Sequence, residues 1–306
     1  MDLAYYYELW RGMMLSADPA VADAVAWWQE FYVKFYMAFI EADRWKQYLD
    51  GIGTTLTATA LALVLGVVLG ILVALVRTAH DQQRADRRRN PVLGLFNGVC
   101  KVYVTVIRGT PMMAQAMFIY YGLMPLLGIN STITQAAYFI LSINTGAYMA
   151  ETVRGGILSI DPGQTEGAKS IGMTHVQTMI YVILPQALRN LMPQIGNNLI
   201  INIKDTSVMF VIGFVEFFAT HRNIVGNNLL YFPSAIIEMA GYLILTLAAS
   251  FLLRWLEKRL DGSDNYELVS TDSLAMSAGT YSHPSRKTPF DERSGEFGSG
   301  RPKGEY

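Results

Sequence analysis

The sequence predicts an all-α polytopic membrane protein with about five transmembrane helices and a short helical hairpin on the cytoplasmic side. Hydrophobic residues make up 52% of the 306 residues and charged residues only 16%, against about 25% charged residues in a typical soluble domain. Long stretches carry no charged residue, and a polar segment at residues 161–185, set between apolar stretches, carries two sets of helix-capping residues. These three observations place most of the chain in a lipid bilayer.

Residues 1–50 form an extension before the first uncharged stretch. They lack the basic start, apolar core and cleavage site of a signal peptide. They are rich in Tyr, Trp and Phe, and the charges of Glu30 and Lys34 interrupt the apolar run. Aromatic rings favour the membrane interface, so we expect an extracytoplasmic amphipathic helix that rests there, with a sixth span as the alternative.

The chain from residue 51 to residue 260 is predicted to be the transmembrane domain. Gly53 to Val76 has 24 consecutive residues without a charge, more than the ~20 needed to cross the hydrocarbon core. Gly109 to Ala150 contains no Asp, Glu, Lys, Arg or His, and turn-forming residues in its middle divide it into two spans. A stretch interrupted by polar residues and a last apolar stretch give two more. The predicted spans are about 53–77, 102–124, 133–155, 188–218 and 234–256.

The distribution of Lys and Arg between loops predicts the orientation of these spans. The loop from Arg77 to Lys101 carries six basic residues, whereas loops 125–132 and 219–233 together carry only Arg222. Basic loops stay in the cytoplasm, so we expect the N-terminus outside and the C-terminus inside. Residues 261–306 are mostly polar and are expected to be a disordered cytoplasmic tail.

The polar segment 161–185 is predicted to begin with one short helix. Asp161 is a good N-cap, Pro162 suits the first helical position, and Gln164 can complete a capping box. Gly172 can adopt the left-handed conformation that ends a helix. The first helix is therefore expected to end there.

A second short helix is expected after Gly172. Thr174 and Gln177 repeat the capping pattern, and Pro185 predicts that this helix stops at Leu184. The surface between the two helices mixes charged, polar and apolar side chains. Such a surface suits docking into a protein groove better than burial in lipid.

The residues of this hairpin resemble a known family signature. Glu166-Gly167-Ala168, the later Gly172, and Ile183-Leu184-Pro185 are similar to the E-A-A signature of membrane subunits of bacterial ABC importers. Gly167 replaces the first alanine, which costs about 0.5–1 kcal/mol in a helix interior. Further matches resemble the polar amino acid uptake branch: Arg108-Gly109-Thr110-Pro111, Gly146-Ala147-Tyr148 with Glu151 and Arg154, and Lys204-Asp205-Thr206-Ser207.

The resemblance, from about Asp50 to Leu260, implies a type I ABC importer-like fold in a bacterial inner membrane. It implies two copies of a cytoplasmic ATP-binding subunit, a second permease subunit of the same or a related chain, and an extracellular substrate-binding protein, for which the N-terminal extension is a possible docking surface. ATP and Mg²⁺ would bind the partner subunit. The residues implied in coupling to the ATPase are Glu166, Gly167, Ala168, Ser170, Gly172 and His175.

Polar residues inside the fourth span are candidates for the substrate path, because ionisable groups at membrane depth usually face a cavity or a partner. Asn198, Asn202 and Asp205 are spaced i, i+4, i+7 and share one helical face. Asp205 can accept from the ammonium group of an amino acid, and Lys204, Thr206 or the amides can donate to its carboxylate. Alternatively, Lys204 and Asp205 pair with each other or with a neighbouring subunit.

Other polar residues are secondary candidates for the path. Arg108 and Arg154 lie near inner span ends, where they can also snorkel or contact carbonyl groups. Cation-selective members of the family tend to carry an acidic residue near the position of Asn198, so the amide here favours a neutral polar amino acid such as glutamine. The secondary candidates are Arg108, Thr110, Asn144, Glu151 and Arg154.

Motifs for catalysis by this chain are missing from the sequence. It has no G-x-x-x-x-G-K-[ST] phosphate loop, no H-E-x-x-H pair and no G-x-S-x-G elbow, and its histidines, His221 among them, fall in predicted loops or in the tail. We therefore expect a transport subunit that is not an enzyme and that binds no metal or nucleic acid. The alternative function is a gradient-driven secondary amino acid transporter that uses Lys204 and Asp205 as a proton relay.

Overall fold

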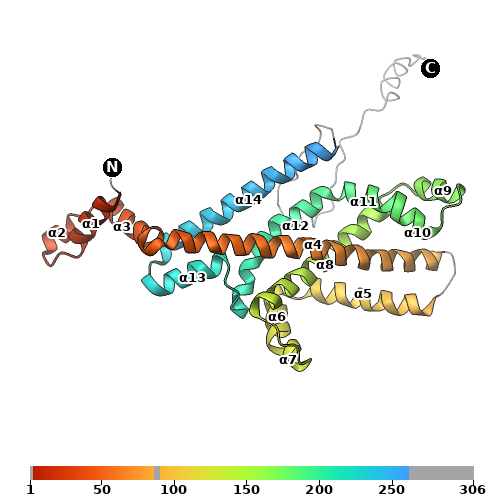
Figure 1. Cartoon of the computed structure of the whole chain (residues 1–306), viewed down its shortest axis with the longest axis horizontal. Helices are drawn as coiled ribbons and strands as arrows, with labels where there is room; N and C mark the ends of the chain where they lie inside the picture. Colours follow the sequence, from red (N-terminus) through yellow and green to blue (C-terminus); the bar gives the residue numbers. More distant parts are fainter. Residues whose placement is uncertain (1–2, 86–89, 262–306) are drawn as a thin grey trace, which may run out of the picture. The chain divides into compact units, whose positions relative to one another are not determined.

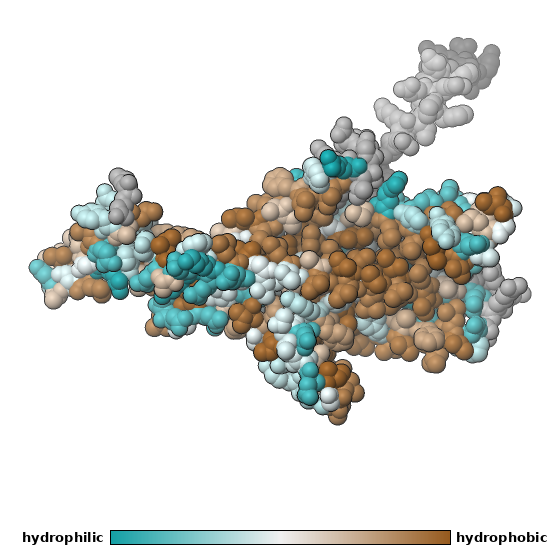
Figure 2. Space-filling view, in the orientation of Figure 1, coloured by the Kyte–Doolittle hydropathy of each residue, from teal (hydrophilic) through white to brown (hydrophobic). Residues whose placement is uncertain are grey.

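The computed structural model describes residues 3–85 and 90–261, and all regular secondary structure within these ranges is helical. The predicted tail lies outside the described residues except for Asp261, which ends the last helix, and so does the basic stretch 86–89. Figure 2 shows a broad hydrophobic surface over the middle of the molecule, with hydrophilic residues gathered towards its ends. This distribution suits a protein that crosses a bilayer.

The centre of the fold is a close pair of helices, α4 (Arg44–Ala85) and α8 (Ile133–Leu158), which run side by side (Figure 1). Gly66 and Gly70 of α4 allow this approach. A Cβ added at Gly66 would lie 2.6 Å from the Thr145 side chain, and one at Gly70 would lie 2.4 Å from Met149 Cβ. Small residues four apart permit such packing in membranes. Helix α8 is consequently buried along most of its length.

The second span was predicted as one helix over 102–124, but the structure divides this part of the chain into separate helices. Helix α5 (Pro91–Gly109) begins earlier, because Asn90 caps it and Pro91 suits its first turn. It then ends at Thr110, which is extended (φ −125°, ψ 150°) because a proline follows. The chain resumes as α6 (Met112–Met117), which Figure 1 shows turned away from α5.

Two π-helical turns carry the chain past prolines that would otherwise end a helix. The first, η2 (Phe118–Leu123), precedes Pro125 in α7 (Met124–Leu126), and the second, η3 (Met179–Ile183), precedes Pro185. A proline ring clashes with the carbonyl four residues back in an α-helix, and the wider turn relieves that clash. The prediction that a helix stops at Leu184 was therefore wrong. Helix α10 (His175–Thr178) runs through η3 into α11 (Leu184–Asn190).

The fourth predicted span is bent. Helix α12 (Met192–Asp205) continues as a 3₁₀ segment, η4 (Thr206–Ile212), up to Gly213, whose φ of +85° turns the chain. Helix α13 (Phe217–Asn228) follows at an angle of 51° and occupies most of the predicted loop 219–233.

Length and hydropathy identify the candidate membrane-spanning helices of the structure. Over the described residues, α4, α5 and the last helix, α14 (Tyr231–Asp261), are each long and apolar enough to cross a membrane, and the bent pair of α12 to α13 is a fourth candidate. The remaining predicted span is α8, which neighbouring helices enclose.

The N-terminal extension forms several helices where one amphipathic helix was expected. Helix α1 (Leu3–Met14) packs against α3 (Trp27–Phe39), with the short α2 (Pro19–Asp23) between them. Tyr7 stacks on Tyr36 at 4.2 Å between ring centroids, and burial, with the hydrogen bond to Glu41, raises the pKa of Tyr7 to about 12. Contact with the outer membrane interface stays a prediction.

Candidate functional site

The first helix of the polar hairpin, α9 (Pro162–Ser170), is capped mainly as the sequence predicts. Asp161 Oδ1 accepts from Gly163 N at 2.7 Å. Gln164 does not complete a capping box. Its Oε1 instead accepts from Gln186 Nε2 at 3.2 Å, which links α9 to α11.

The turn between α9 and α10 has the predicted glycine geometry. Gly172 has φ +90°, and its N–H bonds to Lys169 O while Met173 N bonds to Ala168 O, at 3.0 and 3.2 Å. These two bonds form a Schellman motif. Thr174 then caps α10 in a reciprocal capping box with Gln177.

The hairpin presents an open surface and a buried one. Ala168 is buried, His175 is half-buried, and Glu166, Gly167, Ser170 and Gly172 are exposed. Two large apolar side chains are also exposed on it, Ile171 at 79% and Val176 at 62%. The Glu166 side chain makes no hydrogen bond or ion pair with any other described residue. The open surface is therefore available to a partner, and its role in coupling stays a prediction.

The chain that leaves the hairpin, η3 with α11, packs onto α4 and the end of α8. Residues 159–161 connect α8 to α9, so the hairpin is joined to α8 both through the chain and through this packing. The buried cluster consists of Ala74, Val153, Ile157, Met179, Ile183, Ala187 and Leu191.

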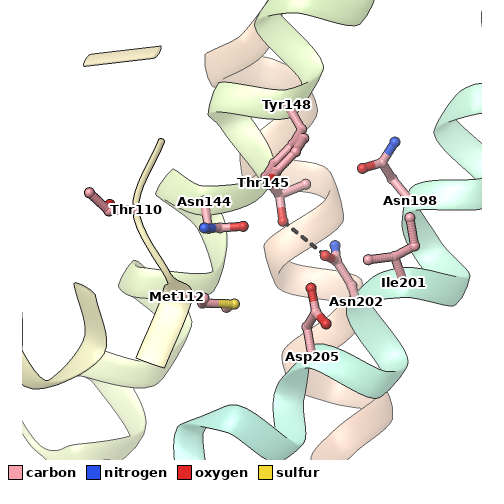
Figure 3. A pocket seen from close by; sticks show the side chains of 9 residues that line it. All are labelled: Thr110, Met112, Asn144, Thr145, Tyr148, Asn198, Ile201, Asn202 and Asp205. Atoms are coloured by element: carbon pink, nitrogen blue, oxygen red, sulfur yellow. Dashed lines mark hydrogen bonds between the residues drawn. The ribbon is translucent and has the colours of Figure 1, made fainter. Parts of the chain in front are cut away.

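A cavity of about 230 Å³ lies between α8, α12 and the break after α5 (Figure 3). The predicted stripe of Asn198, Asn202 and Asp205 lines it together with the secondary candidates Thr110 and Asn144. The remaining lining residues are Met112, Thr145, Tyr148 and Ile201. Lys204 is exposed and Thr206 is buried against the backbone of Ile203, and neither of them lines the cavity.

Polar links hold the cavity walls together. Gln115 Nε2 lies 2.8 Å from both the carbonyl and the hydroxyl oxygen of Thr110, and Gln115 Oε1 accepts from Asn144 Nδ2 at 3.1 Å. On the other wall, Thr145 Oγ1 bonds to Asn202 Oδ1 at 3.1 Å (Figure 3). These bonds connect the α5–α6 break to α8, and α8 to α12.

Two polar groups of the cavity are left without partners. Asn202 Nδ2 is buried and has no hydrogen-bond partner among the residues that the structure describes. The Asp205 carboxylate makes no hydrogen bond and no ion pair within 4 Å to another described residue, so it does not form the predicted alternative pair with Lys204 within this chain. An unpaired buried donor and an unpaired carboxylate are costly without a ligand. Together they can bind a small molecule that carries both an acceptor and a cationic donor.

A network of charges lies beside the cavity, where the arginines were expected to snorkel or to contact carbonyl groups. Arg108 Nη1 instead lies 2.9 Å from Glu151 Oε2, and Arg77 Nη1 lies 3.5 Å from the same oxygen. Arg154 pairs with Asp81 at 2.9 Å. The secondary candidates Arg108, Glu151 and Arg154 thus form ion pairs that tie α8 to α4 and α5.

The sequence reasoning missed some polar residues of this region. Gln115 and Thr145 lie in the charge-free stretch between Gly109 and Ala150, where they were treated as part of a span. Glu216 is completely buried and accepts hydrogen bonds from Thr55 and Tyr242. His221, which was expected in a loop, is 1% exposed in α13. The sequence feature that could have identified these residues is their position as isolated polar residues near or within apolar stretches.

Comparisons with known proteins show the family to which the chain belongs. Residues 92–262 match the family model described as binding-protein-dependent transport system inner membrane component. The chain is 38% identical over 213 residues to the glutamine transport system permease protein GlnP of Escherichia coli K12, covering 69% of this chain and 92% of the relative. The L-cystine transport system permease protein TcyB of Bacillus subtilis is 34% identical, covering 72% and 90%. A crystal structure of an amino acid ABC transporter with histidines is similar at a TM-score of 0.61 and 37% identity, covering 70% of this chain and 94% of that chain.

Proposed function

The chain belongs to the family of inner membrane components of binding-protein-dependent transport systems, and we propose that it is the permease subunit of an ATP-driven glutamine importer. In such a complex a binding protein delivers the amino acid outside and a cytoplasmic ATPase supplies the energy. ATP and Mg²⁺ bind the ATPase, of which we propose two copies beside a second permease subunit. The basic loops orient the N-terminus outwards and the C-terminus towards the cytoplasm.

The observation that carries this proposal is the continuity of α8 between the cavity and the hairpin. Asn144, Thr145 and Tyr148 line the cavity from α8, and the same helix leads into α9, whose Glu166 side is open. ATP-driven closure of the ATPase subunits moves the hairpins, α8 follows, and the cavity opens alternately to the two sides. The ligand shifts this equilibrium only by its different affinity for the two states.

The lining of the cavity favours a small neutral amino acid. Its volume of about 230 Å³ is below the ~300–1,000 Å³ of pockets for drug-sized ligands. Asp205 suits an α-ammonium group, and Asn198 and Asn202 offer the donors and acceptors that match a side-chain amide. The glutamine permease GlnP, 38% identical to this chain, supports the same substrate.

Uptake by the complete complex in proteoliposomes tests this proposal. We expect saturable, ATP-dependent glutamine uptake that persists when an ionophore removes the proton gradient. Tight uptake of arginine or lysine without competition from glutamine would contradict the substrate. Uptake that disappears with the gradient at constant ATP would favour the gradient-driven alternative, which the relatives do not support.

A further inference from the structure

We propose that Arg108 and Glu151 form a second binding site, for the charged backbone of a free α-amino acid, between the cavity and the cytoplasm. This inference rests on the proposed function, because it assigns a later step of the same transport path. It concerns residues that do not line the cavity itself. The substrate would leave the cavity, bind here briefly, and then enter the cytoplasm.

The position of the site follows from the direction of α8. Asn144 and Tyr148 line the cavity, and Glu151 lies about one turn further along the helix towards the hairpin. The guanidinium of Arg108 lies 5.4 Å from the centre of the Tyr148 ring and 2.9 Å from Glu151. Tyr148 therefore contacts the cavity and is also a neighbour of the Arg108–Glu151 pair.

The charge balance at this point favours an incoming carboxylate. Arg77 and Arg108 both approach the same oxygen, Glu151 Oε2, so two cations share one anion. Only Nη1 of the Arg108 guanidinium bonds to Glu151, and a guanidinium has five donors that match a carboxylate. Glu151 Oε1, which bonds to no described residue, can accept from the α-ammonium group.

The accessibility of the pair separates it from a purely structural ion pair. The side chains of Arg108 and Glu151 are 41% and 38% exposed, whereas Arg77 is 15% exposed. Charged side chains at membrane depth face a water-filled path or a partner, since lipid contact is costly. An accessible pair next to the cavity is therefore placed where a zwitterion must pass.

Transport kinetics of the reconstituted complex, with radiolabelled glutamine as the probe, test this site. We expect Arg108→Gln to lower the maximal uptake rate about tenfold, while the KM for the glutamine-loaded binding protein stays within about twofold, because entry into the cavity is unchanged. Arg108→Lys keeps the positive charge but lacks the planar guanidinium that matches a carboxylate, and its maximal uptake rate is expected to fall about threefold. The matched control is Asp81→Asn, which removes another 2.9 Å ion pair between α4 and α8 and is expected to stay within about twofold of wild type.

The outcomes separate this inference from the proposed function. Equal losses in Arg108→Gln and Asp81→Asn, or a loss in Arg108→Gln that appears only in KM, would overturn the second site and leave the importer intact. A wild-type complex that does not transport glutamine would instead contradict the proposed function. If Arg108→Gln fails to assemble, Arg108→Lys against Asp81→Asn decides, and equal rates in that pair would overturn the site.

Discussion

The polar hairpin and the cavity satisfy most of their polar groups in different ways. In the hairpin the bonds are local, as between Thr174 and Gln177. In the cavity they join distant parts of the chain, as between Thr145 and Asn202 or between Gln115 and Asn144. A locally bonded hairpin keeps its shape while it moves, whereas a cavity closed by bonds between helices changes when those helices move. This difference suits a hairpin that moves as a unit and thereby changes the shape of a binding site.

The largest effect is expected where α8, which lines the cavity, packs against α4. Gly70→Leu places a side chain where a Cβ alone would lie 2.4 Å from Met149 Cβ and 2.8 Å from the backbone of Ala150. We expect a loss of about 3 kcal/mol in the free energy of unfolding, because the overpacked pair α4–α8 must separate. Thermal unfolding in detergent measures it. Gly53→Leu, on the same helix with open space around it, is the control, and equal melting temperatures would contradict the packing argument.

Asp205→Asn is expected to have the next largest effect, on transport. A charged hydrogen-bond partner contributes about 1.5–3 kcal/mol, which corresponds to a roughly 10–150-fold lower uptake rate. The ATPase subunit should remain bound, because Asp205 is remote from the hairpin. Lys204→Gln, which changes the neighbouring residue that does not line the cavity, should lose less. A larger loss in Lys204→Gln than in Asp205→Asn would show that Lys204, a path candidate from the sequence, contributes more to transport than the residue that lines the cavity.

A smaller effect on the cavity is expected from Thr145→Val. This change removes the 3.1 Å bond to Asn202, which contributes about 1 kcal/mol, so the KM for uptake is expected to rise about fivefold. Thr57→Val removes only an exposed bond to Gly53 O and serves as the control. An unchanged KM in Thr145→Val would show that the link between α8 and α12 does not shape the cavity.

The smallest effect is expected in the hairpin. Thr174→Ala removes an N-cap, which costs about 1 kcal/mol. Because the cap is local, hydrogen exchange should accelerate in α10 and stay unchanged in α8 and α12. Faster exchange in the cavity helices as well would show that the two regions are not separable in this way.

The same difference explains what the sequence could predict. The ends and caps of the hairpin depend on neighbouring residues, so Asp161, Gly172 and Thr174 were identified correctly. The cavity stripe on α12 was visible because its three residues repeat at helical spacing. Gln115, Thr145 and Tyr148 were missed, since their role depends on which helices meet, and sequence spacing does not contain that information.

The errors also have physical causes. Pro111 divides α5 from α6, whereas Pro125 and Pro185 do not end their helices, because π-turns precede them. Sequence rules for proline treat these cases alike. Arg108 and Arg154 find carboxylates on other elements, and such partners appear only when the helices are placed. His221 was expected in a loop because a short amphipathic helix near a bend resembles one in sequence.

The central claim is that the hairpin engages an ATPase while the cavity carries the substrate. It is tested most directly by purifying the wild type, Glu166→Arg and Asp205→Asn from membranes in mild detergent and identifying the co-purifying proteins by mass spectrometry. We expect an ATPase subunit with the wild type and with Asp205→Asn, and its loss from Glu166→Arg, which still inserts into the membrane. An ATPase retained by Glu166→Arg, or a stable wild-type complex without one, would contradict the claim.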